Sequence, residues 1–436
     1  MKSSIVFQHQ LSVYPEQGKL GVLTKDTLFW QQNGVERQLS LNDIVGTSEW
    51  SGSSDGYGLA VYAYPKVQKG RFIKKQQRKL REFYFTCSSD RERSQWQQAI
   101  DNTLAGKPID AVVKHRRLKI IINPLGGKGQ AWQIFTKIRS LFDRSNLEYT
   151  VTKTYSAADT QNLVKELDLT QIDGLVIVGG DGTIHYAIAG LMSRRDRQTA
   201  IELPLGVIPG GTGNGLSKTL LELSGESYDP LNAAFLIAKG KQQAFDIAAI
   251  EQNGTKYYSF LSLAWGLISD VDIGSEKLKF LGALRFDLYA LLLLGLRRTY
   301  KGRFSFLPHP DCQIATDRDS RSGKWRVIED EFIFVWAMNT AWAAHDKNVT
   351  PHAELNDGAM DVLIMRQGTS RWEILKALLR CGKGQHLDLP HLEYYKVRAF
   401  RLEPMTERGI LVVDGEPIDY SPIAMKMIPD LACVNC

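Results

Sequence analysis

A single carboxylate, Asp181, stands between glycines in the stretch Gly179-Gly-Asp-Gly-Thr183. The apolar run Leu175-Val-Ile-Val178 precedes this stretch, and a helix-like pattern follows it over residues 184–193. An aspartate at such a junction is either an ordinary helix cap or a carboxylate held beside a reacting group. Glycine neighbours favour the second interpretation, because they leave room for close approach of a ligand.

Two further glycine-rich turns come directly after strand-like segments. They are Asn123-Pro-Leu-Gly-Gly-Lys-Gly129 and Pro209-Gly-Gly-Thr-Gly-Asn-Gly215. Such turns let several backbone N–H groups converge on a phosphate, and a helix N-terminus behind the turn adds a partial positive charge. The first turn does not have the Walker A spacing, and the third lacks G-x-G-x-x-G because Leu216 follows it, which disfavours a dinucleotide-dependent dehydrogenase. Three turns in about one hundred residues together predict a phosphate site that contains Asp181.

The elements that must hold these turns alternate between strand and helix. Strand-like segments are expected at 118–123, 149–154, 175–178 and 205–208, and helix-periodic segments at 130–142, 159–167 and 184–193. This alternation predicts a doubly wound α/β domain, which binds ligands at the carboxyl ends of its strands.

The regions on either side of the α/β part have a different pattern. Residues 1–112 form short strand-like segments that close with a capped helix over 88–101, an order that resembles a pleckstrin-homology (PH-like) β domain. Residues 246–436 are strand-rich with one strong helix near 280–298, and they resemble an antiparallel β-sandwich. We therefore expect three domains: PH-like at 1–112, α/β nucleotide-binding at 117–245 and β-sandwich at 246–436.

Composition narrows the class of protein. The chain of 436 residues is too long for one ordinary domain, and its five scattered cysteines without a secretory signal favour a reducing cytoplasmic compartment. The longest apolar run covers nine residues, 288–296, well short of the roughly 20 that a membrane-spanning helix needs.

Positive charge is concentrated near the start of the chain. Residues 1–117 hold 18 Lys and Arg against 11 Asp and Glu, and the stretch 65–81 holds eight cations and no acid. Such a run is either a solvated loop or a site for anionic lipid headgroups. The sequence therefore leaves open a peripheral association with a membrane surface, while we expect no nucleic-acid partner.

The three turns, in this order and spacing, resemble the diacylglycerol-kinase catalytic domain superfamily of lipid kinases. The stretches 261–272, 275–277, 284–286 and 296–303, together with Asn356-Asp-Gly-Ala-Met-Asp361 and Asp414-Gly-Glu416, make the chain similar to sphingosine (long-chain base) kinases over about 117–420. The resemblance implies transfer of the ATP γ-phosphoryl group to the primary hydroxyl of a sphingoid base, with Mg²⁺ bridging the phosphates.

By this resemblance, Asp181 is the general base that takes the proton of the lipid hydroxyl. The residues that the resemblance places around ATP are Asn123, Gly126, Gly127, Lys128, Gly129, Thr154, Gly180, Gly182, Thr183, Gly211, Thr212, Gly213, Lys279, Arg285, Asp414 and Glu416. Lys279 stands where the family usually has Arg, which keeps the charge but loses the bidentate fork.

The resemblance also places residues around the lipid. Asp272, with help from Ser262, is the position that contacts the amine, and Ile268 and Phe286 are expected to line the acyl-chain pocket. A sphingoid base carries a primary amine that is protonated near pH 7, as a lysine side chain is with its ordinary pKa of about 10.4, so a carboxylate at the mouth of an apolar cavity selects it. Asp270 competes with Asp272 for this role, and its alternative is a structural hydrogen-bonded aspartate.

The sequence departs from the family pattern behind the catalytic turn. Tyr186 stands where the family usually has Glu, Ala189 where it has Asn, and Asp159 where it has His. These departures leave two alternatives open: a ceramide or diacylglycerol kinase, and a membrane-binding scaffold whose kinase domain has decayed. A homodimer is also left open.

Overall fold

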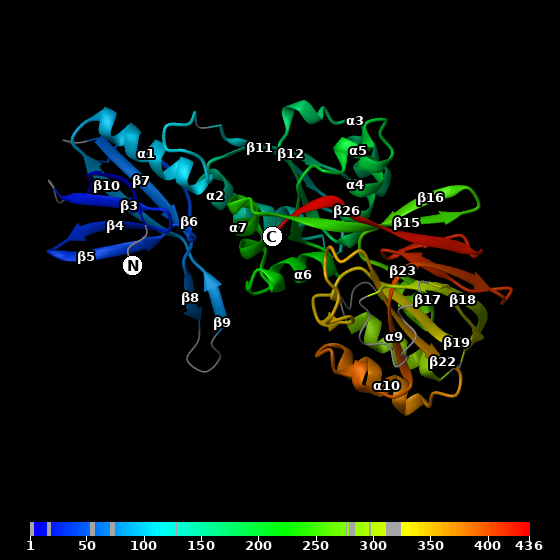
Figure 1. Cartoon of the computed structure of the whole chain (residues 1–436). Helices are drawn as coiled ribbons and strands as arrows, with labels where there is room; N and C mark the ends of the chain where they lie inside the picture. Colours follow the sequence, from blue (N-terminus) through cyan, green and yellow to red (C-terminus); the bar gives the residue numbers. More distant parts are fainter. Residues whose placement is uncertain are drawn as a thin grey trace. The chain divides into compact units, whose positions relative to one another are not determined.

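The computed structural model describes residues 4–14, 19–52, 57–69, 75–112, 114–127, 129–275, 277–278, 284–295, 298–310 and 324–436. Its chain divides into two compact units (Figure 1). The first comprises residues 1–118, 135–150 and 225–241, and the second comprises residues 119–134, 151–224 and 242–436.

The first unit contains two antiparallel sheets, with strand orders β1-β3-β4-β5 and β2-β10-β7-β6, and a separate hairpin β8-β9. Their bounds are β1 Ile5–Gln10, β2 Ser12–Val13, β3 Leu20–Thr24, β4 Thr27–Gln32, β5 Val35–Ser40, β6 Ile44–Trp50, β7 Tyr57–Ala63, β8 Lys66–Lys69, β9 Lys75–Arg78 and β10 Arg81–Cys87. Helix α1 (Asp90–Leu104) begins at the N-cap Ser89, whose side chain accepts from the Glu92 N–H. The helix buries Trp96 in the same core as Phe85, and the indole N–H donates to the Gln10 carbonyl at 2.9 Å.

Helix α7 (Pro230–Lys239) also belongs to the first unit. It has Asp229 as its N-cap, Pro230 in the first turn and the left-handed Gly240 as its C-cap, all favourable for these positions. Arg78 of β9 is buried against this segment, 3.6 Å from the Phe235 ring centre and 2.7 Å from a Glu226 oxygen.

The strands and helices between residues 116 and 223 alternate as predicted. Their bounds are β11 Arg116–Ile122, α2 Ala131–Asp143, β12 Leu147–Lys153, α3 Ala157–Glu166, η1 Leu169–Gln171, β13 Gly174–Gly179, α4 Asp181–Met192, α5 Arg197–Ala200, β14 Leu205–Pro209 and α6 Gly215–Leu223. β13 and β14 are parallel neighbours and are buried along their whole length, which explains their continuous apolar sequence.

The remaining elements form the β-rich C-terminal part of the second unit. Their bounds are β15 Gln242–Gln252, β16 Thr255–Ser259, β17 Ser262–Gly266, α8 Leu267–Gly274, α9 Leu284–Leu294, β18 Tyr300–Pro308, β19 Arg326–Met338, β20 Trp342–Ala344, β21 Lys347–Asn348, β22 Met360–Arg366, α10 Arg371–Cys381, η4 Gln385–Asp388, β23 Leu392–Pro404, β24 Leu411–Val413, β25 Glu416–Ile418 and β26 Ile423–Asn435. Helix α10 has the capping box Ser370-Arg-Trp-Glu373, a helix signal that the sequence prediction overlooked.

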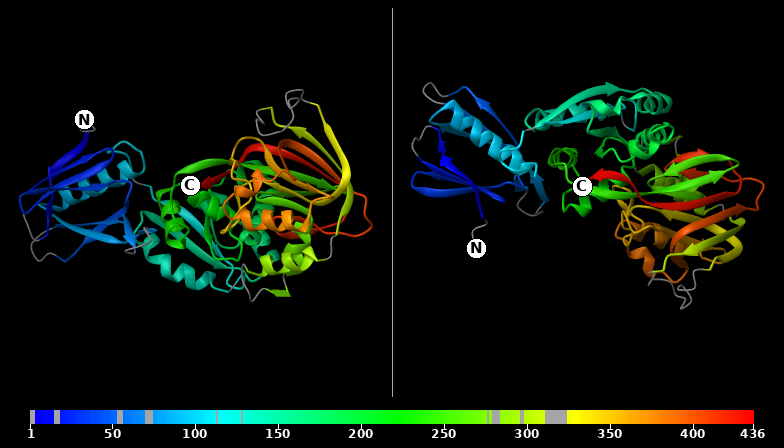
Figure 2. Two further views of the ribbon diagram at one scale, coloured as in Figure 1. Left: turned by 90° about the horizontal axis from the view of Figure 1, so that it is seen from below. Right: turned by 45° about the horizontal axis from the view of Figure 1, so that its top comes forward.

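The C-terminal strands continue the α/β sheet. The strand order is β12-β11-β13-β14-β26-β23-β18-β19-β17-β24-β25, with β26 joined to β14 at Val434 and Leu205. Figure 2 shows β26, in red, lying alongside β15, in green, and these two strands pair antiparallel from Gln242 opposite Asn435. The last residues of the chain therefore return to the centre of the sheet that carries the glycine turns.

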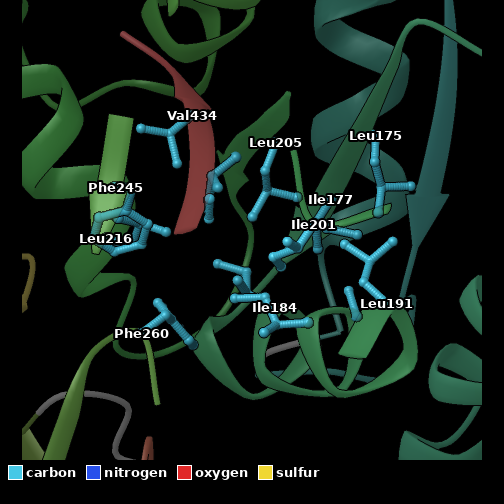
Figure 3. Close-up of a cluster of buried hydrophobic side chains, with 14 of the residues drawn as sticks. Leu175, Ile177, Ile184, Leu191, Ile201, Leu205, Leu216, Phe245, Phe260 and Val434 are labelled. Carbon is cyan, nitrogen blue, oxygen red and sulfur yellow. The ribbon is translucent and has the colours of Figure 1, made fainter. Parts of the chain in front are cut away.

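One apolar cluster holds this junction together. Figure 3 shows side chains of β13, β14, α4, α6, β15 and β26 pointing toward one another, among them Ile177, Ile184, Leu205, Phe245 and Val434. Each is at most 5% exposed. Burial of this many large apolar groups stabilises the sheet and the helix N-termini at its edge.

No helix within the described ranges is long and apolar enough to cross a bilayer.

Candidate active site

The three glycine turns meet backbone to backbone at the carboxyl ends of β11, β13 and β14. A Cβ atom on Gly211 would lie 2.3 Å from the Gly180 Cα, and one on Gly127 would lie 2.8 Å from the Gly211 Cα. Real Cβ atoms do not approach that closely, so glycine is required here by the packing of the turns on one another. The sequence analysis expected these glycines to leave room for a ligand, and the contact between the turns is a second reason for glycine at these positions.

Two asparagines hold the first and third turns in shape. The Asn123 carboxamide oxygen accepts from the N–H groups of Leu125 and Gly126, at 3.0 and 3.1 Å. Asn214, in the left-handed region with φ of 60°, exchanges two hydrogen bonds with the backbone of Gly211.

Asp181 is the first residue of α4 and is buried where the second and third turns meet. Its Oδ2 accepts the Gly215 N–H at 2.8 Å, so the carboxylate caps α6 and not the helix on which it lies. Its Oδ1 is buried and has no hydrogen-bond partner among the described residues. A buried oxygen without a partner is costly, and here it belongs to a residue that lines a cavity.

The surroundings raise the pKa of Asp181 to about 6. Burial is the largest cause, because it disfavours the charged form, and the charge of Asp414 acts in the same direction. Backbone N–H groups of Gly215, Leu216 and Asn214 oppose the shift. A carboxylate with a pKa near 6 is ionised at pH 7 and is a stronger base than an ordinary aspartate.

Asp414 lies behind Asp181 in the tight turn between β24 and β25. Its carboxylate accepts from the backbone N–H groups of Phe260, Leu261 and Ser262 and from the Ser259 hydroxyl, at 2.7–3.2 Å. It is also 2.9 Å from Nδ1 of His185 on α4. Burial lowers the pKa of His185, but the hydrogen bond and the charge of Asp414 outweigh burial and raise it. Asp414 therefore ties α4 to the β16–β17 loop.

Tyr186 makes a second connection between α4 and the β24–β25 hairpin. Its hydroxyl donates to the Glu416 carboxylate at 2.9 Å, and burial together with the Glu416 charge raises the pKa of Tyr186 to about 12. The position at which the sequence departs from the sphingosine kinase pattern thus holds Glu416 next to the turn that contains Asp181. A Cβ atom on Gly182 would lie 3.0 Å from a Glu416 oxygen.

One cavity of about 510 Å³ joins the glycine turns to an apolar region of the second unit. The predicted residues that line it are Asn123, Gly126, Gly127, Gly180, Asp181, Gly182, Thr183, Gly211, Thr212, Gly213, Ser262, Ile268, Asp272, Arg285, Phe286, Asp414 and Glu416. The polar turns and the apolar helices therefore share one space, as a phosphoryl transfer between a nucleotide and a lipid requires.

The apolar end of the cavity lies between α8, α9, α10 and β19. Leu267 and Val271 of α8, Ala290 of α9 and Leu378 of α10 line it together with Trp336 of β19. The aliphatic and aromatic surface there suits a hydrocarbon chain.

Asp272 and Asp270 lie on different cavities. Asp272 lines the main cavity, with Oδ2 only 3.9 Å from the place a Cβ atom on Gly415 would take. Asp270 faces a second cavity, accepts the Tyr300 hydroxyl and lies 3.8 Å from an Arg298 nitrogen. Two residues along a helix turn by about 200°, so only one of them can face the main cavity. This geometry favours the second interpretation of Asp270, that of a structural hydrogen-bonded aspartate.

Arg285 of α9 is a buried cation in the cavity wall. It is 9% exposed, its guanidinium lies 4.4 Å from the Phe286 ring centre, and Nε and Nη1 have no partner among the described residues. An unpaired buried guanidinium is costly, and an anionic ligand would satisfy it.

Several predicted residues are not in the cavity wall. Thr154 is buried beneath it, and its hydroxyl accepts from Thr160, which does line the cavity. Gly129 donates back to the Gly126 carbonyl and closes the first turn. Lys128 and Lys279 lie outside the described residues. Asp159 takes part in capping α3, where its carboxylate accepts the Tyr155 N–H.

The sequence prediction missed the cavity residues of the β20–β21 hairpin and α10. These are Ala343, Ala344, Lys347, Leu378 and Cys381. The capping box of α10 was a usable signal for the helix, but two short strands around His345-Asp-Lys347 carry no comparable signal.

Two family models match the chain, one over its α/β part and one over its β-rich C-terminal part. Residues 117–250 match the diacylglycerol kinase catalytic domain, and residues 319–435 match the YegS C-terminal NAD kinase beta sandwich-like domain. A putative diacylglycerol kinase from Bacillus anthracis str. Sterne has a similar fold, with a TM-score of 0.56 and 21% identity over 75% of this chain and 97% of that chain. The matched catalytic domain places this chain in the class of lipid kinases.

Curated relatives narrow the class. Sphingosine kinase 1 of Arabidopsis thaliana is 33% identical over 77% of this chain and 74% of its own length, and sphingosine kinase 1 of Homo sapiens is 33% identical over 72% and 88%. Sphingoid long chain base kinase 4 of Schizosaccharomyces pombe is 30% identical over 73% and 75%. The chain belongs to the sphingosine kinase family.

Proposed function

We propose that the chain transfers the γ-phosphoryl group of ATP to the primary hydroxyl of a sphingoid long-chain base. The observation that carries this proposal concerns Asp181, which lines the cavity shared by the glycine turns and the apolar helices. One of its oxygens accepts the Gly215 N–H, and the other has no hydrogen-bond partner among the described residues. The free oxygen takes the hydroxyl proton as the new O–P bond forms and the bond from phosphorus to the ADP oxygen breaks.

The nucleotide side of the proposal rests on the three turns and Arg285. Backbone N–H groups of the turns and the Arg285 guanidinium, whose Nε and Nη1 have no partner among the described residues, bind the phosphates. Glu416 is kept in place by Tyr186. Within the described ranges no group of three His, Cys, Asp or Glu side chains could hold a metal. Mg²⁺ bound together with the nucleotide would neutralise phosphate charge.

The substrate side rests on Asp272. Its carboxylate lies in the cavity beside the β24–β25 turn and near the apolar walls, where a protonated amine would pair with it. An N-acylated lipid has a neutral amide at that nitrogen and diacylglycerol has none, so neither would replace the charge pair.

Competing lipids in one assay test this choice of substrate. We expect the free base to be phosphorylated in preference to ceramide and diacylglycerol, and Asp272→Asn to raise KM for the base at least about tenfold while KM for ATP changes little. Radiolabelled ATP with the three lipids at equal concentration gives both quantities. The matched control is Asp270→Asn, since Asp270 faces the second cavity.

Preference for ceramide or diacylglycerol would contradict the substrate assignment. An equal rise in both KM values would remove Asp272 from the amine. Absence of phosphoryl transfer to every lipid would favour the decayed scaffold.

We infer further that the lipid reaches the cavity from a membrane surface. Helix α9 has cavity-lining residues on one side and the exposed Leu284, Leu288, Leu291 and Leu292 on another, each at least 50% exposed. A helix with leucines in water suits an interfacial position.

The three-domain organisation is also our proposal, with bounds 1–112, 117–245 and 246–436. Two four-stranded sheets closed by one helix support a PH-like N-terminal domain. The match of residues 319–435 to a beta sandwich-like domain supports the C-terminal assignment.

A further inference from the structure

The β20–β21 hairpin is packed on the third glycine turn. The His345 N–H donates to the Gly213 carbonyl at 3.0 Å, and Ala344 forms a β-bridge with Asn214. Trp342 donates its N–H to Thr219 of α6 at 3.3 Å, and the Lys218 ammonium lies 4.3 Å from its indole ring. The hairpin therefore keeps a defined position relative to the phosphate turns.

The same hairpin also reaches the lipid side of the cavity. A Cβ atom on Gly382, the residue after α10, would lie 2.9 Å from the Asp346 carbonyl. Lys347 follows Asp346 and lines the cavity together with Leu378 and Cys381 of α10. The hairpin thus connects the glycine turn that contacts Asp181 with the helix that lines the apolar end.

Charge in the cavity wall makes Lys347 significant. Among the described lining residues, Lys347 and Arg285 are the cations, while Asp181, Asp272 and Asp414 are acids together with Glu416. A nucleotide triphosphate and a lipid phosphate both bring further negative charge. Lys347 lies 3.7 Å from the carboxylate of its neighbour Asp346, and a phosphate group that enters the cavity would compete for its ammonium.

We propose that Lys347 contacts the transferring phosphoryl group at the junction between the nucleotide and lipid halves of the cavity. This inference rests on the proposed kinase function and deepens it. An ammonium on a flexible four-carbon stem can follow the phosphoryl group from the nucleotide to the lipid oxygen, which a planar fork such as that of Arg285 does less easily. The contact gains most when charge is spread over the phosphoryl oxygens in the transition state.

Three variants test the role of Lys347. Lys347→Met keeps the length of the side chain and removes its charge, and we expect kcat to fall about 100-fold with a smaller change in KM for the base. Lys347→Arg should recover activity to within about tenfold of the wild type, because it restores the charge. Lys383→Met, an exposed lysine just after α10 and outside the cavity wall, should have wild-type kinetics.

Thermal unfolding of each variant separates a role in chemistry from one in folding. Unchanged Tm with the expected loss and rescue supports the proposal. A lowered Tm in both Lys347 variants with matching losses of activity would assign a structural role and overturn it. If Lys347→Met behaves like Lys383→Met while the wild type is active, this inference is wrong and the kinase assignment stands. A wild type that phosphorylates no lipid would overturn both.

Discussion

The two oxygens of Asp181 have different tasks. Oδ2 caps α6 through the Gly215 N–H, and Oδ1, which has no partner among the described residues, is the oxygen that the proposed reaction would use. The alternatives of helix cap and reacting group are therefore compatible within one carboxylate. The capping hydrogen bond would also orient the proposed base, because it fixes the side chain without occupying the second oxygen.

Replacement of Asp181 by Asn separates these tasks. Asp181→Asn keeps an oxygen for the Gly215 N–H but loses the base, so we expect activity to fall at least about 100-fold with little change in Tm. In the wild type, kcat/KM should be constant above pH 7 and fall about tenfold per unit below pH 6, because the carboxylate with pKa of about 6 becomes protonated as the pH falls. Initial rates across pH 5 to 8 measure this.

Asp181→Ala is the matched control for the cap. It should lose the same activity and also about 1 kcal/mol of stability, since α6 loses its capping acceptor. Unchanged turnover in Asp181→Asn would remove Asp181 from the role of base, and a profile that rises toward low pH would do the same.

At the scale of elements, α4 is tied to the β24–β25 turn by two adjacent side chains. His185 reaches Asp414, and Tyr186 reaches Glu416, about 230 residues later in the chain. Asp414 has a φ of 52° in this turn, and its carboxylate accepts the N–H of Ser262 at the end of the β16–β17 loop. We infer that Tyr186 positions Glu416, so that a departure from the family pattern at this residue is compatible with the proposed site.

Tyr186→Phe tests the tie. Loss of one hydrogen bond to a carboxylate should cost about 1 kcal/mol of stability and raise KM for ATP about fivefold, because Glu416 is no longer held. Urea denaturation and steady-state kinetics measure the two effects. Tyr258→Phe is the control, since the Tyr258 hydroxyl has no hydrogen bond within the described part of the chain. Indifference of both stability and KM to Tyr186→Phe would show that the contact positions nothing.

At the scale of the whole molecule, the basic stretch 65–81 is only partly free to meet a membrane. Lys66 and Arg78 both pair with Glu226, and Arg78 also pairs with Asp43 within the first unit. Burying Arg78 without these partners would be costly, so these two cations serve the fold of the unit. Lys79 and Arg81 are exposed and are the described cations that the proposed membrane association would use. Arg71 and Lys74 lie outside the described residues.

Vesicle binding tests this division. Binding to vesicles that contain phosphatidylserine should weaken as salt rises from 0.05 to about 0.5 M, and the Lys79→Glu, Arg81→Glu double variant should bind at least about tenfold more weakly. The control is the Lys107→Glu, Lys114→Glu double variant, which makes the same change of charge at two exposed lysines of the same unit. If both double variants weaken binding equally, net charge and not the stretch 65–81 accounts for it, and insensitivity to salt would favour the solvated-loop alternative.

The glycine turns and the strands that precede them were predictable from the sequence. A glycine turn that follows an apolar strand can be recognised from a short stretch of sequence, because backbone freedom and strand burial depend on neighbours in the chain. Asp181 and the strand–helix alternation were therefore found, and the family resemblance pointed to Asp272 and Arg285 before their surroundings were known.

The partners of these residues were decided by packing over long distances in the chain. The sequence around Tyr186 does not predict its contact with Glu416, and the sequence around Lys347 does not predict the contact of its hairpin with the third glycine turn. These contacts form only when β24–β25 and the β20–β21 hairpin pack in the folded chain. The choice between Asp270 and Asp272 likewise depends on which side of α8 faces the cavity. Residue types set the chemistry that is possible, while the burial of apolar faces sets which groups meet, since the hydrophobic free energy belongs to the whole core and not to any short stretch.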